Sequence, residues 1–215
     1  MCGIVGAIAE RNVSDILLEG LKRLEYRGYD SAGIALLNSN SGKLSDLKTV
    51  GKVEKLVNSA TKAKLRGNLG IAHTRWATHG KPTVANAHPH NSAKELFIAH
   101  DGIIENYQRL RAILKKDGYS FKTETDSETV AHLIHKERKS GKVSLVDATR
   151  KTIRKLDGAY GLCVIDKTLP DQIVVARSGS PLVIGIGIGE NFVASDPLAL
   201  GPVSYTHLTL PTNRE

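Results

Sequence analysis

The first forty residues alternate between a strand pattern and a helical pattern. Residues 1–9 (MCGIVGAIA) are a short apolar run that two glycines interrupt, which is typical of a buried strand. Leucine and isoleucine then recur three or four positions apart, which predicts a helix that Asn12 or Ser14 caps and that ends at Arg27. Residues 31–37 return to a strand pattern that begins with small side chains and ends with aliphatic ones.

Helical spacing dominates the middle of the chain and strands dominate its last part. Strand patterns cover residues 70–76 and 96–99, and strand and turn alternate from residue 159 onward. A long loop with proline and histidine lies over residues 78–91, and such loops often carry binding residues. The helical patterns cover residues 53–63, 104–116, 127–139 and 143–156.

Strands at both ends with helices between them do not follow the alternation of a doubly wound sheet. Antiparallel sheets covered by helices are therefore expected, which is an α+β fold. No internal repeat or linker is visible, so we expect one domain over residues 1–202. Residues 203–215 (VSYTHLTLPTNRE) have neither period nor caps, and we interpret them as an expression or sequencing artefact.

Composition excludes several classes of protein. The chain has 215 residues with 30 Lys or Arg and 22 Asp or Glu, giving a net charge of +8, and 40% hydrophobic residues, as in ordinary globular proteins. No apolar stretch approaches ~18 residues and no export signal is visible, so no membrane partner is expected. Most of the excess charge lies in residues 51–100, where a solvated surface, an anionic small molecule and nucleic acid are the alternatives. Because the basic residues form no block interleaved with aromatics, we expect no nucleic-acid partner.

The two cysteines have different surroundings. Two are too few for a disulfide framework, which favours the cytoplasm. Cys163 lies in an apolar strand pattern and is predicted to be buried and inert. Cys2 follows Met1, and removal of Met1 would leave a terminal cysteine whose own α-amino group can accept the thiol proton. The alternative is that Cys2 is an ordinary residue of a buried first strand.

Seven further motifs accompany Cys2. They are LEYRGYDSAG at 24–33, HTRWATHG at 73–80, NAHPH at 86–90, HDGIIEN at 100–106, ETD at 124–126, RSGSPLVIG at 177–185 and ENFVASD at 190–196. In order and spacing the chain resembles, over about residues 2–202, the class II glutaminase domain of the glucosamine-6-phosphate synthase family. The resemblance implies the amino-terminal-nucleophile hydrolase fold, a four-layer αββα sandwich with two antiparallel sheets between helical layers.

The resemblance also implies roles for individual residues. Cys2 would be the nucleophile, and Gly102 N–H with the side chain at position 101 would form the oxyanion hole. Arg75 would pair with the α-carboxylate of glutamine, which suits a planar guanidinium, and Asp126 would hold the α-ammonium. The rest of the pocket and its mobile cover would be formed by Trp76, Thr78 and His79, and Trp76 would also lie where ammonia leaves the site. The residues that support the pocket from behind would be Arg27, His88 and His100.

Three of these residues have structural alternatives. Arg75 could form a surface ion pair, and Asp126 could cap the helix that begins at residue 127. His88 and His90 form an H-P-H pair that resembles metal ligands, but no second ligand pair has a recognisable spacing and the nearby thiol is needed as nucleophile. We therefore expect neither a metal nor another cofactor.

Position 101 departs from the family pattern. The family usually has Asn where this chain has Asp101, and loss of one oxyanion donor typically costs ~10² to 10³ in rate. Either Asp101 is protonated and still donates, in which case turnover should fall as the carboxyl loses its proton with rising pH, or the chain is a weakened glutaminase.

The expected activity is hydrolysis of L-glutamine to glutamate and ammonia through a γ-glutamyl thioester on Cys2. In the full enzyme of this family the ammonia would pass to fructose 6-phosphate bound by sugar-isomerase domains, which the sequence after residue 202 does not contain. A homodimer is left open. The alternatives are the glutaminase domain of another class II amidotransferase, such as one resembling phosphoribosylpyrophosphate amidotransferase or asparagine synthetase, and a non-catalytic regulatory or ammonia-gating module.

Overall fold

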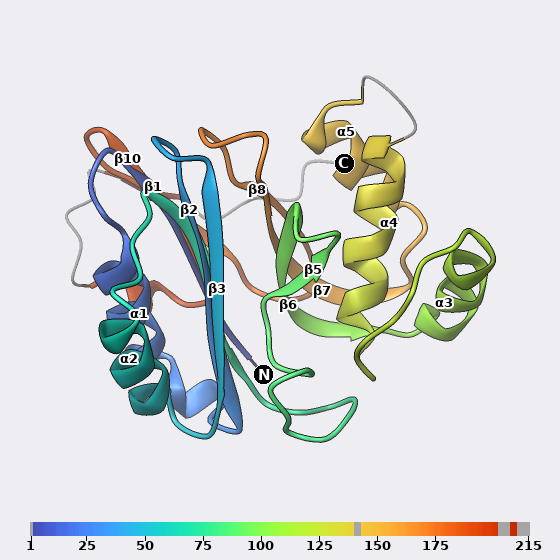
Figure 1. Ribbon diagram of the computed structural model, residues 1–215, viewed down its shortest axis with the longest axis horizontal. Coiled ribbons are helices and arrows are strands. Elements are labelled where there is room, and N and C mark those ends of the chain that lie inside the picture. Colours follow the sequence, from blue (N-terminus) through green and yellow to red (C-terminus); the bar gives the residue numbers. More distant parts are fainter. Residues whose placement is uncertain (1, 140–142, 202–206, 210–215) are drawn as a thin grey trace.

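Two antiparallel sheets lie face to face, and helices cover the outer face of each (Figure 1). The computed structural model describes residues 2–139, 143–201 and 207–209. Helices α1 and α2 cover one sheet, and α4 and α5 lie on the other side of the molecule with α3 beside them (Figure 1). The predicted α+β class and the four layers of the αββα sandwich are confirmed.

The first sheet has the strand order β11-β9-β10-β1-β4-β2-β3, and the second has the order β5-β6-β7-β8. The strands of the first are β1 Gly3–Ala9, β2 Ser31–Asn38, β3 Lys43–Val50, β4 Leu69–Arg75, β9 Val183–Ile186, β10 Glu190–Ala194 and β11 His207–Thr209. Those of the second are β5 His90–Ser92, β6 Leu96–Ile104, β7 Gly158–Asp166 and β8 Val174–Ser178. The helices are α1 Ser14–Arg23, α2 Val53–Lys62, α3 Tyr107–Lys116, α4 Ser127–Lys139 and α5 Leu145–Ile153, with 3₁₀ turns η1 Glu25–Arg27 and η2 Pro197–Leu200.

Three apolar clusters hold the layers together. One lies between the first sheet and α1 and α2, and a second lies between the second sheet and α3, α4 and α5. The third lies between the two sheets and includes Leu69, Ile71, Phe97 and Cys163. Cys163 is fully buried on β7, as predicted.

The position of β1 inside the first sheet explains its apolar sequence. β1 pairs with β4 on one side and with β10 on the other, so it lies inside the first sheet. One face of β1 packs on α1 and the other packs toward the second sheet, as Val5 and Ile4 show by their membership of two different clusters. A strand covered on both faces is expected to be a nearly continuous apolar run, which is what residues 1–9 are.

Several predicted boundaries were wrong. The first helix was expected to end at Arg27 but ends at Arg23, and the 3₁₀ turn η1 continues to Arg27. The first helix begins at Ser14 after Val13, which provides no side-chain cap, and the Oδ1 atom of Asn12 accepts from Gly67 N at 3.0 Å and from Ser14 N at 3.5 Å. The strand predicted over 96–99 continues to Ile104 because its last residues pair with β7, so the helix predicted from residue 104 begins only at Tyr107.

The last part of the chain is described only in part. Of the tail predicted over residues 203–215, His207–Thr209 form β11, which pairs antiparallel with β9 at the edge of the first sheet. The remaining tail residues, like Met1, lie outside the described residues. Among the described helices, none combines the length and the apolar character that a membrane crossing needs.

Candidate active site

Cys2 lies just before β1, at the end of the first sheet where β4 finishes. Because Gly3 is paired with Thr74, the cysteine comes next to the residues that follow β4. The amide of Trp76 donates to the Cys2 Sγ atom at 3.4 Å, and the thiol is 3.7 Å from the Trp76 carbonyl oxygen, to which it donates. The backbone after β4 therefore fixes the position of the thiol.

Two charged residues contact the backbone of Cys2. Its nitrogen donates to the Asp101 Oδ1 atom at 2.7 Å, and its carbonyl oxygen accepts from Arg27 Nε at 2.9 Å. The Arg27 guanidinium also faces the Asp101 Oδ2 atom at 3.7 Å. Arg27 comes from η1 and Asp101 from β6, so these contacts link Cys2 to η1 and to the second sheet.

The thiol of Cys2 is difficult to ionise in this position. Burial and then the nearby Asp101 carboxylate raise its pKa to about 12, against the lowering effect of the Trp76 amide. A thiol is nucleophilic only as the thiolate, so at neutral pH this group needs a base that takes its proton during attack. The nitrogen of the same residue is the nearest candidate once it is a free amine.

Gly102 follows Asp101 on β6 and lines the cavity beside Cys2. Its φ is +142°, and a Cβ atom at this position would lie 2.0 Å from the Ala159 carbonyl oxygen. Only glycine can therefore occupy the position, since any side chain would collide with β7.

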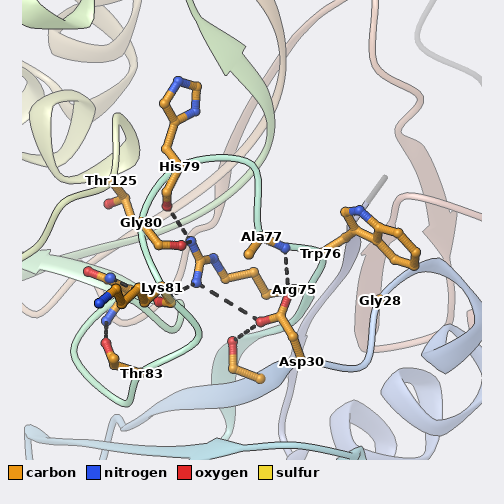
Figure 2. Close-up of polar contacts among 12 residues, drawn as sticks. Gly28, Asp30, Arg75, Trp76, Ala77, His79, Gly80, Lys81, Thr83 and Thr125 are labelled. Atoms are coloured by element: carbon orange, nitrogen blue, oxygen red, sulfur yellow. Dashed lines mark hydrogen bonds and ion pairs between the residues drawn. The ribbon is translucent and has the colours of Figure 1, made fainter.

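Arg75, the last residue of β4, is buried and holds the following loop. Its guanidinium donates to the carbonyl oxygens of Gly80 at 3.2 Å and of Lys81 at 3.3 Å, and also to that of His79 (Figure 2). The Asp30 carboxylate lies 4.0 Å away (Figure 2). Arg75 is only 3% exposed, so it does not form the surface ion pair that was the alternative. In this arrangement the loop carbonyls use the donors that a substrate carboxylate would need.

Asp126 lies on the opposite wall of the same cavity, just before α4. It is buried, and its Oδ2 atom accepts from Ile104 N at 2.9 Å. This bond ties the carboxylate to the end of β6, while the Oδ1 atom accepts from the hydroxyl of Ser127, the first residue of α4, at 3.4 Å. These two bonds do not include a backbone N–H of α4, which a helix cap, the structural alternative for Asp126, would accept.

Trp76, Thr78 and His79 lie on the loop that follows β4. Trp76 is 49% exposed, and its ring packs edge-on against Tyr29 with 5.6 Å between ring centroids. His79 packs edge-on against Tyr107 at 5.3 Å. The two rings point to different sides of Arg75 (Figure 2).

One small cavity brings most of the predicted site residues together. It measures about 10 Å³, room for about one water molecule. Thr125 and Ser127 line it and were missed, although they flank Asp126 in the sequence. Asp101 and Arg27 lie behind it. The lining residues are Cys2, Arg75, Trp76, Thr78, His79, His88, His100, Gly102, Thr125, Asp126 and Ser127.

A group of buried histidines includes two that line this cavity, His88 and His100. His88 stacks on His73 at 4.0 Å and lies 4.3 Å from His90 between ring centroids. His100 Nδ1 is bonded to the Ser127 hydroxyl at 2.8 Å, which supports the wall that carries Asp126. Burial lowers the pKa of His73 to about 3 and that of His88 and His90 well below the ordinary value, so the three rings are neutral at neutral pH.

The described residues contain no group of three or more His, Cys, Asp or Glu arranged to hold a metal ion. The two rings of the H-P-H motif, His88 and His90, meet edge-on, and His88 stacks on His73.

A family model described as a glutamine amidotransferase domain matches residues 73–202. This range includes the loop after β4, Gly102 and Asp126, and it covers more than half of the chain. The chain belongs to the glutamine amidotransferase domain family. The predicted class is therefore confirmed.

Curated relatives of this glutamine amidotransferase domain extend the match toward the first residue. Glutamine–fructose-6-phosphate aminotransferase (isomerizing) of Idiomarina loihiensis is 58% identical over 210 residues, which are 98% of this chain and 34% of that protein. The protein of the same name from Pseudomonas aeruginosa is 58% identical over 205 residues, 95% of this chain and 33% of that protein. The chain thus spans about a third of the length of the curated relatives it matches.

Solved structures share the fold of this amidotransferase domain. Glutamine phosphoribosylpyrophosphate amidotransferase from B. subtilis has a TM-score of 0.81 at 29% identity, covering 98% of this chain and 46% of that one. A class II glutamine aminotransferase domain protein from Silicibacter pomeroyi has a TM-score of 0.66 at 15% identity and covers 91% of that chain, which shows the fold alone.

Proposed function

We propose that this domain hydrolyses L-glutamine to glutamate and ammonia, with Cys2 as the nucleophile. The observation that carries the proposal is the placement of the Cys2 thiol beside Gly102, in one cavity with Arg75 and Asp126. An isolated thiol at the start of a strand would have no such partners. Membership of the glutamine amidotransferase domain family supports the same activity.

The reaction begins when Met1 has been removed and Cys2 carries a free α-amino group. The Sγ atom attacks the γ-carbonyl carbon of glutamine while the α-amine takes the thiol proton, and the carbonyl electron pair moves onto oxygen. Gly102 N–H stabilises this oxyanion. When the oxyanion collapses, the C–N bond breaks, and the leaving NH₂ group takes the proton from the α-ammonium and departs as ammonia.

Water completes the cycle by cleaving the γ-glutamyl thioester. The α-amine accepts a proton from the attacking water, the C–S bond breaks, and the thiolate recovers the proton as glutamate leaves. The chain thus needs one group that accepts and returns a proton twice. The nitrogen of Cys2 suits this use because it belongs to the same residue as the nucleophile.

The α-carbon of glutamine carries two groups of opposite charge, a carboxylate and an ammonium, and the cavity offers the matching groups. Arg75 is assigned to the α-carboxylate and Asp126 to the α-ammonium, and both are almost fully buried, where charge-assisted bonds are strong. For Arg75 to bind, the carbonyls of residues 79–81 must release it. Substrate entry and opening of the loop are then the same event.

In the larger enzyme the ammonia is proposed to pass to fructose 6-phosphate, giving glucosamine 6-phosphate. The printed names of the curated relatives support this partner reaction, and their greater length leaves room for the sugar-isomerase domains. We place the glutaminase domain at residues 1–202. We also propose a cytoplasmic location and an artefact origin for residues 203–215, and a homodimer stays open.

The second candidate is a non-catalytic module that binds glutamine or gates ammonia. The observation that favours it is the Asp101 carboxylate, which lies next to Gly102, the proposed oxyanion donor. A domain of another class II amidotransferase is the third, since the B. subtilis structure shares the fold.

The test is glutamate release from L-glutamine by the chain freed of Met1. We expect turnover that is lost when Cys2 is replaced by Ala and kept when Cys163 is replaced by Ala. 6-Diazo-5-oxo-L-norleucine, an electrophilic glutamine analogue, should label Cys2 once. Glutamine binding without glutamate release would support the non-catalytic module and overturn the proposal.

A further inference from the structure

Both oxygens of the Asp101 carboxylate face positive or donating groups. Oδ1 accepts from Cys2 N at 2.7 Å, and Oδ2 faces the Arg27 guanidinium at 3.7 Å. Asp101 is 4% exposed and Arg27 is 8% exposed, so water does little to weaken these contacts. Oδ1 thus accepts a hydrogen bond and Oδ2 faces a positive charge, so neither oxygen is placed as a donor.

The position of Asp101 differs from that of an oxyanion donor. The cavity beside the Cys2 thiol is lined by Gly102 but not by Asp101, which lies behind the cysteine backbone. Along β6, Asp101 shares its face with Phe97 and Ala99, which pack between the sheets. The carboxylate therefore reaches the nitrogen of Cys2 rather than the space for the substrate carbonyl.

We propose that Asp101 is a positioning residue, an ionised carboxylate clamped by Arg27 that serves as the counter-ion of the Cys2 α-ammonium once Met1 is removed. The inference rests on the proposed function. It replaces the protonated donor that the sequence suggested at position 101.

The consequence follows from counting protons on the amine and the thiol. With an ammonium and a thiol the site is inactive, because no group can accept the thiol proton. Loss of one proton gives the reactive form, in which a single proton is shared by nitrogen and sulfur, and this loss belongs to the pair as a whole. A carboxylate next to the nitrogen favours the fully protonated form. Asp101 therefore moves the activation of Cys2 to higher pH.

Arg27 limits this effect. Its positive charge on the other oxygen of Asp101 offsets part of the field at Cys2, and its bond to the Cys2 carbonyl oxygen keeps the geometry. A second carboxylate, that of Asp196, lies 3.6 Å from the Arg27 guanidinium and bonds the Tyr26 hydroxyl at 2.7 Å. Asp196 thus shares Arg27 with Asp101 but not the contact to Cys2 N, which makes it a matched control.

The test measures the rate at which iodoacetamide alkylates Cys2 between pH 5 and pH 11, in the chain freed of Met1. Mass spectrometry of the peptide that contains Cys2 separates this reaction from that of the buried Cys163. We expect Asp101→Asn to lower the midpoint of the profile by about one pH unit or more, since a charge within ~4–6 Å typically moves an ionisation by 1–3 units. At a pH on the rising limb this is about a tenfold faster reaction. Asp196→Asn should move the midpoint much less.

Superimposable profiles for the original chain and Asp101→Asn would overturn the inference, and so would an equal shift from Asp196→Asn. Arg27→Gln adds a test of sign, because removing the clamp should move the midpoint to higher pH. Asp101→Asn should also shift the rising limb of kcat for glutamate release to lower pH, whereas a protonated donor predicts that kcat of the original chain falls as pH rises. A shifted alkylation profile without glutamate release from either protein would support the counter-ion and contradict the proposed glutaminase activity.

Discussion

The two ends of the space between the sheets have opposite chemistry, although the same strands build both. On β4, alternate residues face the second sheet, and this face begins with Leu69 and Ile71 and ends with His73 and Arg75. At the apolar end side chains pack without polar partners. At the polar end most side chains make a hydrogen bond, an ion pair or a ring contact. The difference shows that one continuous strand can supply stability at one end and chemistry at the other.

The two cysteines express the same contrast. Burial raises the pKa of both thiols, so neither ionises readily at neutral pH. Cys163 lies among apolar side chains between the sheets, whereas Cys2 has a nitrogen, a carboxylate and a guanidinium around its backbone. Reactivity is therefore decided by whether a base is within reach rather than by the thiol alone.

The largest expected effect comes from the cysteines. Cys2→Ser should lower kcat for glutamate release by at least about three orders of magnitude, because a hydroxyl is a much weaker nucleophile with this base. Cys163→Ser should leave kcat of the folded protein within about twofold and lower its unfolding free energy by ~1–3 kcal/mol through the buried hydroxyl. Steady-state kinetics and urea unfolding measure the two. Comparable losses of kcat in both variants would break the contrast.

The apolar end should respond in stability. Phe97→Ala is expected to lower the unfolding free energy by ~3–5 kcal/mol, because Phe97 is 1% exposed and its loss leaves a cavity between the sheets. Ile103→Ala is the matched control on the same strand, at a position 36% exposed, and should cost less than about 1 kcal/mol. Urea denaturation monitored by circular dichroism gives both values. Equal costs would show that the space between the sheets is not tightly packed.

At the polar end the expected effect is on substrate binding. Arg75→Lys should raise KM for glutamine by about ten- to a hundredfold with a smaller change in kcat, because an ammonium cannot reproduce two parallel N–H donors. Arg66→Lys, at an exposed position before β4, should leave KM unchanged. Initial-rate kinetics over a range of glutamine concentrations decide between them. An unchanged KM in Arg75→Lys would remove Arg75 from the substrate site.

The smallest effect concerns the buried histidines. Their lowered pKa values mean that the unfolded chain binds more protons below about pH 6.5, so stability should fall as pH falls, by up to ~1.4 kcal/mol per pH unit for each ring. For His73 this continues to about pH 3. Both ring nitrogens of His88 lack a hydrogen-bond partner among the described residues, so a Phe ring can replace it without breaking a hydrogen bond. Because His88→Phe removes one titrating ring, it should reduce the slope of the unfolding free energy against pH. Urea unfolding at pH 5, 6 and 7 measures this slope, and identical slopes for the original chain and His88→Phe would contradict this account.

Much of this architecture is predictable from side-chain periodicity. The apolar run of β1 and the helical spacing of α2, α4 and α5 follow directly from local patterns. β3 is harder to predict than these elements, because it is an edge strand with half-exposed residues and a weak alternation of apolar and polar residues. The end of β6 was missed because Asp101 and Gly102 interrupt its apolar pattern. Functional residues are the place where the local pattern of a strand is broken.

The site is predictable in its members but not in its contacts. The motifs identify Cys2, Arg75 and Asp126 as neighbours, and the cavity brings them together. Periodicity cannot show that Arg75 holds the loop or that Asp101 reaches Cys2 N, because both contacts depend on the three-dimensional path of the backbone. Those contacts, and not the residue types alone, decide what Arg75 and Asp101 do in the site.

The most direct test of the central claim is detection of the γ-glutamyl thioester. The chain freed of Met1 would be mixed with L-glutamine, quenched with acid within the first turnovers and digested for mass spectrometry. The account predicts one γ-glutamyl group on the peptide that contains Cys2, none on the peptide that contains Cys163, and none on either peptide when Met1 is retained. Glutamate release without an adduct on Cys2, or an adduct formed equally well with Met1 in place, would contradict it.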